Sequence, residues 1–145
     1  MTKLLTCALA LALCASCVGP AQRREDSLMK IAREFNDGLR WGRDDQVYRY
    51  LTPTEARSLQ VRKADLGDDF VMADHEVKSI QIVPGGERAT VVAEFTWFNQ
   101  RRAVVQKSTV EEKWEWLDDH WMVTSQSRIA GDRFPLVPER AEAAH

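Results

Sequence analysis

Cysteine is the residue type whose placement in this chain bears most directly on chemistry. The chain has 145 residues and three cysteines, Cys7, Cys14 and Cys17, all within the first seventeen positions. Residues 18–145 contain no cysteine. Because a disulfide framework, a cysteine-rich zinc site and a cysteine nucleophile all need thiols, these are excluded from the body of the chain.

The segment before Cys17 has the composition of a secretory signal peptide. Lys3 supplies a positive charge, and an apolar run of about a dozen residues follows it. The run is too short to cross a bilayer core, which needs about 20 apolar residues. Ala15 and Ser16 stand directly before Cys17, and the segment resembles a bacterial lipobox in which Cys14 replaces the usual Leu. The resemblance implies a signal peptide over residues 1–16 and a lipidated Cys17, followed by a tether over residues 17–25.

The predicted lipid anchor also predicts a location. A diacyl thioether and an amide-linked acyl chain of the palmitate type exceed the two signals that stable membrane attachment requires. In the lipoproteins that this segment resembles, Asp after the cysteine favours the inner membrane, so Val18 favours the outer one. We expect a protein anchored in the bacterial cell envelope and facing the periplasm. Cleavage after Ala21, which would release a soluble periplasmic protein, is the alternative.

Glu112 is the carboxylate whose position suggests chemistry in the body of the chain. It is in phase with Val110, Trp114 and Trp116, so its side chain is predicted to point to the apolar side of a strand. One interpretation is a buried base or a ligand anchor, because burial raises the pKa of a carboxyl and shifted pKa values are typical of catalytic groups. The other is a carboxylate near a strand edge or paired with an arginine such as Arg101, Arg102 or Arg128.

The histidines do not complete a catalytic or metal-binding set. His75 is expected in an irregular segment at the start of the sheet, and His120 at a turn. Asp118 and His120 could ligate a metal, but two ligands fall short of a site with three or four. No Gly-x-Ser-x-Gly nucleophile elbow is present. We therefore predict no catalytic residues, no metal and no cofactor.

The aromatic side chains are predicted to form most of the core. Trp97, Trp114, Trp116 and Trp121 all lie in strand-like segments, and aromatics bury large areas in a small domain. An alternative is that one or two of them line the mouth of a cavity. Tyr48 is a further candidate for such a position.

Three helices are predicted in the first half of the chain. Leu28, Ile31, Ala32, Phe35 and Leu39 recur at helical spacing, which predicts a helix from Asp26 that ends at Gly42. Asp44 and Asp45 can start a shorter helix. Thr52, Pro53 and Glu55 form a capping-box pattern for a third helix, from Pro53 to about Ala64.

After Gly67 the apolar period changes to two, which predicts strands. The segments expected to be extended are residues 70–83, with a bulge near Ser79, then 89–98, 103–117 and 121–125. In the second of these, Ala89, Val91, Ala93, Phe95 and Trp97 share one side. Turn-forming residues separate the segments, as in an antiparallel meander. Residues 132–145 are expected to be an extended C-terminal tail.

Helices followed by a meander predict an α+β fold, with N-terminal helices packed on a curved antiparallel sheet. This order, and the closing pattern of Trp114, Trp116, Trp121 and Val123, resembles the NTF2-like (cystatin-like α+β, SnoaL-type) superfamily over residues 26–131. The resemblance implies a cone-shaped fold with a pocket between helices and sheet. It makes Glu112, Trp97, Trp114, Trp116 and Tyr48 possible pocket residues.

Charge and composition narrow the classes of function. Lys and Arg number 20 and Asp and Glu 22, so the net charge of −2 argues against nucleic-acid binding. We expect a non-enzymatic, lipid-anchored module that binds an envelope protein or a small apolar ligand. The alternative is a small pocket enzyme or apolar-ligand carrier that uses Glu112. The partner, the process and the oligomeric state stay open.

Overall fold

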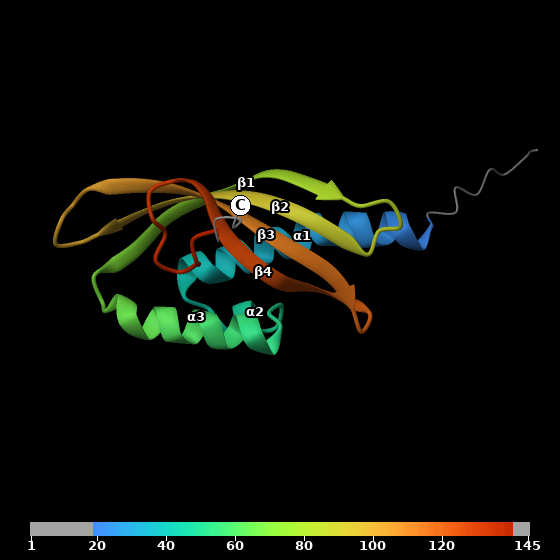
Figure 1. Cartoon of the computed structure of the whole chain (residues 1–145), viewed down its shortest axis with the longest axis horizontal. Coiled ribbons are helices and arrows are strands. Elements are labelled where there is room, and N and C mark those ends of the chain that lie inside the picture. Colours follow the sequence, from blue (N-terminus) through green and yellow to red (C-terminus); the bar gives the residue numbers. More distant parts are fainter. Residues whose placement is uncertain (1–18, 141–145) are drawn as a thin grey trace, which may run out of the picture.

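The computed structural model describes residues 19–140, which form three helices and four strands (Figure 1). The sheet is a meander of neighbouring antiparallel strands in the order β1-β2-β3-β4. The three helices lie on one side of this curved sheet, so the fold is α+β as predicted. In order, the elements are α1 (Pro20–Trp41), α2 (Asp44–Tyr48), α3 (Pro53–Leu66), β1 (Phe70–Ile82), β2 (Arg88–Asn99), β3 (Val105–Leu117) and β4 (His120–Gly131).

Helix α1 begins six residues earlier than the periodicity predicted, within the segment expected to be a tether. Pro20 occupies the first turn, where its missing N–H costs no helical hydrogen bond. Contacts distant in sequence hold this turn in place: the Arg24 carbonyl accepts a hydrogen bond from Trp121 Nε1 (3.0 Å), and Arg24 lies over the Trp116 ring (5.1 Å). Residues 20–25 carry no apolar stripe, so periodicity could not reveal them.

The other helix boundaries follow local signals and confirm the predictions. Gly42 ends α1 in the left-handed conformation (φ 63°). Thr52 caps α3, because its hydroxyl accepts a hydrogen bond from the Glu55 amide, and Pro53 is the first helical residue. Helix α3 ends at Leu66, before Gly67.

The strand alternation is clearest in β2. Ala89, Val91, Ala93, Phe95 and Trp97 are all buried beneath the helices, as predicted. The bulge expected near Ser79 is present between Val77 and Ser79, and a second one lies between Met72 and Asp74. Two of the largest buried side chains are Phe35 of α1 and Trp114 of β3, whose rings meet edge to face at 5.4 Å.

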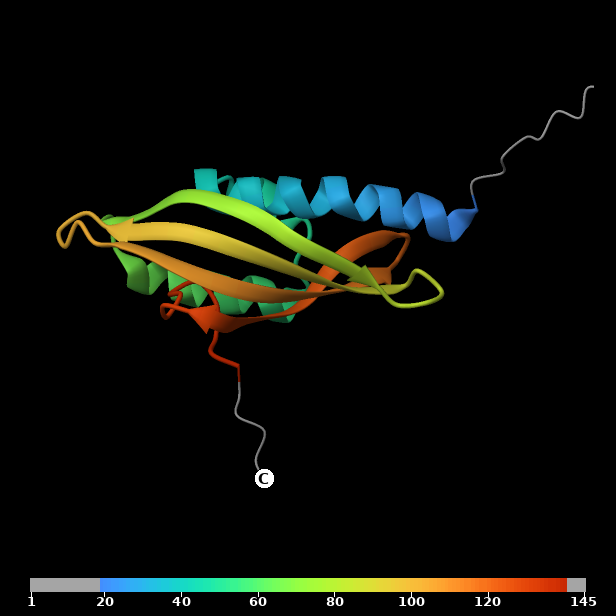
Figure 2. The ribbon, with the colours of Figure 1, turned by 90° about the horizontal axis from the view of Figure 1, so that it is seen from above.

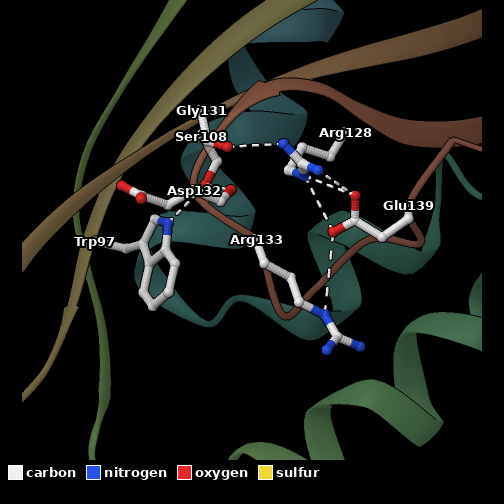
Figure 3. A network of polar contacts seen from close by, with 7 residues as sticks. All are labelled: Trp97, Ser108, Arg128, Gly131, Asp132, Arg133 and Glu139. Carbon is white, nitrogen blue, oxygen red and sulfur yellow. Dashed lines mark hydrogen bonds and ion pairs between the residues drawn. The ribbon is translucent and has the colours of Figure 1, made fainter.

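Residues 132–140, which we name the C-terminal strap, are part of the folded structure. Phe134, Leu136 and Val137 are buried, and Phe134 stacks on Phe95 with ring centroids 4.9 Å apart. Figure 3 shows the polar contacts at the base of the strap, where Ser108 Oγ donates to the Asp132 carbonyl (2.7 Å). The sequence predicted an extended tail here, because a short apolar run after Gly131 does not show what it packs against.

Candidate functional site

Glu112 lies in the middle of β3, an inner strand of the sheet. Its neighbours across the sheet are Val91 on β2 and Gln126 on β4. Its relative exposure is 0%, and that of Trp114 is also 0%. A side chain without accessible surface has no space beside it for a water-sized molecule, so the site around Glu112 is filled by protein atoms.

The Glu112 carboxyl has an incomplete set of hydrogen bonds. Its Oε2 accepts from Trp114 Nε1 (3.0 Å), while Oε1 has no partner among residues 19–140. The side chains of Asn36 and Gln126 are buried beside it, and Asn36 Oδ1 and Gln126 Nε2 are also unpartnered. Burial raises the pKa of Glu112 to about 7, although the hydrogen bond from Trp114 and the neighbouring Asn36 side chain oppose the rise.

The interpretation of Glu112 as an edge residue or an arginine partner is wrong. Arg101 pairs instead with Asp69 (2.6 Å), and Arg128 pairs with Glu139. The phase of β3 correctly predicted that Glu112 points inward, but it did not reveal that Asn36 would come from α1 to meet it.

The predicted pocket residues lie in separate parts of the molecule. Trp97 lies near Phe70 and Phe134 at one end of the sheet and donates to Ser108 Oγ (2.8 Å). Trp116 contacts the start of α1 at the other end of the sheet. Trp97 pairs with Gln106, which precedes Trp116 by ten residues on β3, so the two tryptophans are roughly 33 Å apart. Tyr48 is partly buried on α2, and Trp114 lies between the two ends.

The two histidines within residues 19–140 differ from each other in position. His75 lies within β1, not in an irregular segment, and its Nε2 is 2.8 Å from Asp37 Oδ1 on α1. The expectation of an irregular segment is therefore wrong for His75, whose side chain is only 10% exposed. His120 is exposed beside the β3–β4 turn, as expected, and Nδ1 is 2.8 Å from the Asp118 carbonyl. Within residues 19–140, no three potential metal-ligating side chains form a group.

An apolar groove that the sequence interpretation missed lies where α1 and α3 end and β1 begins. Its volume is about 460 Å³, and Trp41, at 61% exposure, forms part of its wall. Trp41 is about 220° around α1 from Leu28, opposite the apolar stripe. A tryptophan on the polar side of an amphipathic helix was the available signal. The other lining residues are Leu39, Arg40, Gly42, Lys63, Leu66, Gly67, Phe70, Val71, Met72 and Leu136.

Charged side chains at the rim of this groove are held by neighbours. The Arg40 guanidinium lies over the Trp41 ring (4.8 Å) and also pairs with Asp74 on β1 (3.0 Å). Lys63 of α3 pairs with Asp44 of α2. The arrangement leaves an apolar floor with an aromatic wall, which suits an apolar side chain or ligand better than an ion.

The predicted lipidation residue Cys17 lies outside the described residues, as does the predicted signal peptide. In the part of the chain that the structure describes, no helix combines the length and apolar character needed to span a membrane.

Comparisons with known proteins bear on the fold. No protein-family model matches the chain, and no curated protein matches it. The crystal structure of the intermembrane space region of chloroplast protein ARC6 is similar, with a TM-score of 0.52 and 15% sequence identity over 72% of this chain and 95% of that one. At this identity the likeness concerns the arrangement of helices on an antiparallel sheet, and the chain shares that α+β fold.

Proposed function

We propose that this chain is a non-enzymatic, lipid-anchored protein of the bacterial cell envelope that binds a protein partner through the apolar groove at Trp41. The domain faces the periplasm, with the outer membrane favoured by Val18. The resemblance to the NTF2-like superfamily is part of this proposal, because members of that superfamily use the same layout for protein contacts as well as for pockets.

The observation that carries the binding proposal is the exposure of Trp41. Trp41 is 61% exposed and lines an apolar groove, and exposed apolar surface of this kind marks sites of interaction. Arg40 holds the ring from one side, so little side-chain freedom is lost when a partner docks. Aromatic and arginine side chains of this kind dominate the energetics of protein interfaces.

The placement of the groove supports a partner on the periplasmic side. Helix α1 has 22 residues and is therefore about 33 Å long. Its first residue, Pro20, comes three positions after Cys17, whereas Trp41 is its last. Figure 2 shows α1 running along the sheet, and the groove is lined by residues of the last turn of this helix. A lipid at Cys17 would thus place the start of α1 at the membrane and the groove at the far end of the helix.

The burial of Glu112 supports a non-enzymatic function. The pocket-enzyme and carrier alternatives both rely on this acid, and a reacting group must reach substrate. Glu112 has no accessible surface, and Trp114 covers one of its oxygens. The solvent-facing groove, not the interior, is therefore the surface on which we base the function.

Membrane fractionation of a Cys17→Ala variant tests the anchor. We expect the wild-type chain in the membrane fraction with an acylated N-terminal cysteine by mass spectrometry, and the variant in the soluble fraction. Cys14→Ala is the matched control, because it changes the same residue type three positions earlier and should stay in the membrane. Membrane association of Cys17→Ala, together with an unmodified N-terminus in the wild type, would refute lipidation.

Photo-crosslinking in intact cells tests the groove. A photoreactive amino acid is placed at Trp41 or at Met29, which is on the same helix and similarly exposed (50%). We expect a discrete protein adduct from position 41 and none of that mass from position 29. The same adduct from both positions, or none from position 41, would contradict the proposed binding surface.

A further inference from the structure

The most unusual feature of the interior is a cluster of buried polar groups from three elements. It contains Asn36 of α1, Glu112 of β3 and Gln126 of β4, with exposures of 0%, 0% and 6%. We name these three residues the buried polar cluster. In the described part of the chain, each carries one polar atom without a partner, and buried polar atoms of this kind are costly in a folded protein.

The unpartnered atoms have complementary roles. Asn36 Oδ1 and Glu112 Oε1 are acceptors when Glu112 is ionised, whereas Gln126 Nε2 is a donor. Asn36 follows Phe35, whose ring meets that of Trp114 (5.4 Å), the residue that donates to the carboxyl, and Gln126 is the cross-strand neighbour of Glu112. Asn36 Nδ2 already donates to the Ala32 carbonyl (2.9 Å), which directs Oδ1 away from that bond. Within residues 19–140 no donor is bonded to Asn36 Oδ1 or to Glu112 Oε1, and a proton on the carboxyl would supply one.

Charged groups on the surrounding elements face other partners. On β3, Glu111 pairs with Lys113 and Arg140 on the outer side of the sheet. Tyr50 packs against Trp114, but its phenol is next to Glu34 and Arg49. On α1, Asp37 pairs with His75 and Arg40 pairs with Asp74. On β4, Arg128 pairs with Glu139. The residue of β2 that faces Glu112 is the apolar Val91.

We propose that Glu112 is held as a neutral acid whose Oε1 proton is donated to Asn36 Oδ1, and that this bond is a pH-dependent lock between α1 and the sheet. One proton on Oε1 satisfies both orphan acceptors, Glu112 Oε1 and Asn36 Oδ1. Loss of the proton leaves a buried, uncompensated charge facing Asn36 Oδ1, and α1 loosens from β3. The lock is independent of the proposed groove and of the lipid anchor.

The direction of the pH effect follows from linkage. The pKa of Glu112 is raised from the ordinary 4.5 to about 7 by burial, so the folded state keeps a proton that the unfolded state loses. Below pH 4.5 both states are protonated. Between 4.5 and 7 the contribution of Glu112 to the folding equilibrium constant falls about tenfold per pH unit, roughly 300-fold in all. Above pH 7 the folded protein ionises, and the contribution stays constant.

Unfolding of the full-length protein in detergent micelles at pH 4.5 to 8.5 tests the neutral acid. Glu112→Gln mimics the protonated acid, since its amide can donate to Asn36. We expect the wild-type profile, relative to this variant, to fall between pH 4.5 and 7. Glu111→Gln is the matched control, with the same change on the outer side of the strand, and should keep the wild-type fall. A flat difference between wild type and Glu112→Gln overturns the proposal.

Two measurements on the folded protein complete the test. A carbon-13 NMR titration of the wild-type Glu112 carboxyl should have its midpoint near pH 7, and a midpoint near 4.5 overturns the proposal even if Glu112→Gln does not fold. Amide exchange in α1, corrected for the intrinsic effect of pH, should accelerate above pH 7 in the wild type but not in Glu112→Gln. Equal acceleration in both proteins overturns the lock.

Discussion

Two buried polar side chains on β3, Ser108 and Glu112, differ in whether all their polar atoms have hydrogen-bond partners. Ser108 Oγ accepts from Trp97 Nε1 and donates to the Asp132 carbonyl, so the hydroxyl has both kinds of partner in one place. Glu112, four residues further, is buried to the same extent but has an oxygen without a partner. Ser108 therefore fixes the sheet to the strap, whereas Glu112 depends on its protonation state.

At the same scale, strand phase predicted the direction of a side chain but not its neighbours. Alternation along β3 correctly predicted that Glu112 points inward. The partners that decide its chemistry, Asn36 and Gln126, lie 76 positions earlier and 14 positions later in the chain. Only tertiary packing brings these side chains together, so the sequence alone could not show that an arginine would be absent from the contact.

Gly131 is the residue at which a single methyl group should have the largest effect. Its φ is +77°, and a Cβ there would be 2.3 Å from the Lys107 carbonyl oxygen, where β4 leads into the strap. Gly131→Ala combines backbone strain with an overlap that a backbone atom cannot avoid, so we expect a loss of about 3 kcal/mol or more in urea unfolding. Gly85→Ala is the control, because Gly85 also has positive φ but a Cβ added there would meet no described atom within 4 Å. This variant should lose roughly 1–2 kcal/mol of its free energy of unfolding. Equal losses would show that the Lys107 contact is unimportant.

At the scale of elements, those whose ends depend on local chemistry were predictable. The capping pattern of Thr52 and Glu55 correctly predicted the start of α3, and the alternation from Ala89 to Trp97 correctly predicted the buried side of β2. The start of α1 and the strap were not predictable in the same way. Trp121 and Trp116 contact Arg24 near the start of α1, and Phe134 of the strap stacks on Phe95. The start of α1 and the strap are therefore determined by contacts distant in sequence.

The strap offers a comparison between apolar burial and surface ion pairing. Phe134 is 1% exposed and stacks on Phe95, so Phe134→Ala should lower the free energy of unfolding by about 3–5 kcal/mol. Glu139 pairs with Arg128 at the surface (Figure 3), and such pairs contribute about 0–1 kcal/mol, so Glu139→Gln should have a small effect. Chemical denaturation of both variants measures the difference. A larger loss for Glu139→Gln would mean that the ion pair, not the aromatic stack, holds the strap.

At the scale of the whole molecule, the fold separates two ends along α1. The β1–β2 turn lies against the start of the helix, since a Cβ on Gly86 would be 3.3 Å from Ala21. The groove at Trp41 and the β2–β3 turn lie at the other end (Figure 2). Because Cys17 precedes Pro20 by three positions, the span available between a lipid and the domain is roughly 10 Å. In the proposed lipid-anchored form, a domain attached so closely would have little freedom to reverse its ends.

The orientation can be measured because residues 18–145 contain no cysteine. In the proposed mature form, in which Cys17 carries lipid, a cysteine introduced by Gly85→Cys or by Arg102→Cys gives a single labelling site in the β1–β2 or the β2–β3 turn. With each labelled protein anchored in vesicles that contain lipids with spin-labelled headgroups, we expect strong fluorescence quenching at position 85 and little at position 102. The physical reason is that the length of α1, about 33 Å, separates the two turns from each other along the membrane normal. Equal quenching at both positions would mean that the domain lies flat on the membrane, and stronger quenching at position 102 would place the groove against the lipid and contradict a periplasmic partner there.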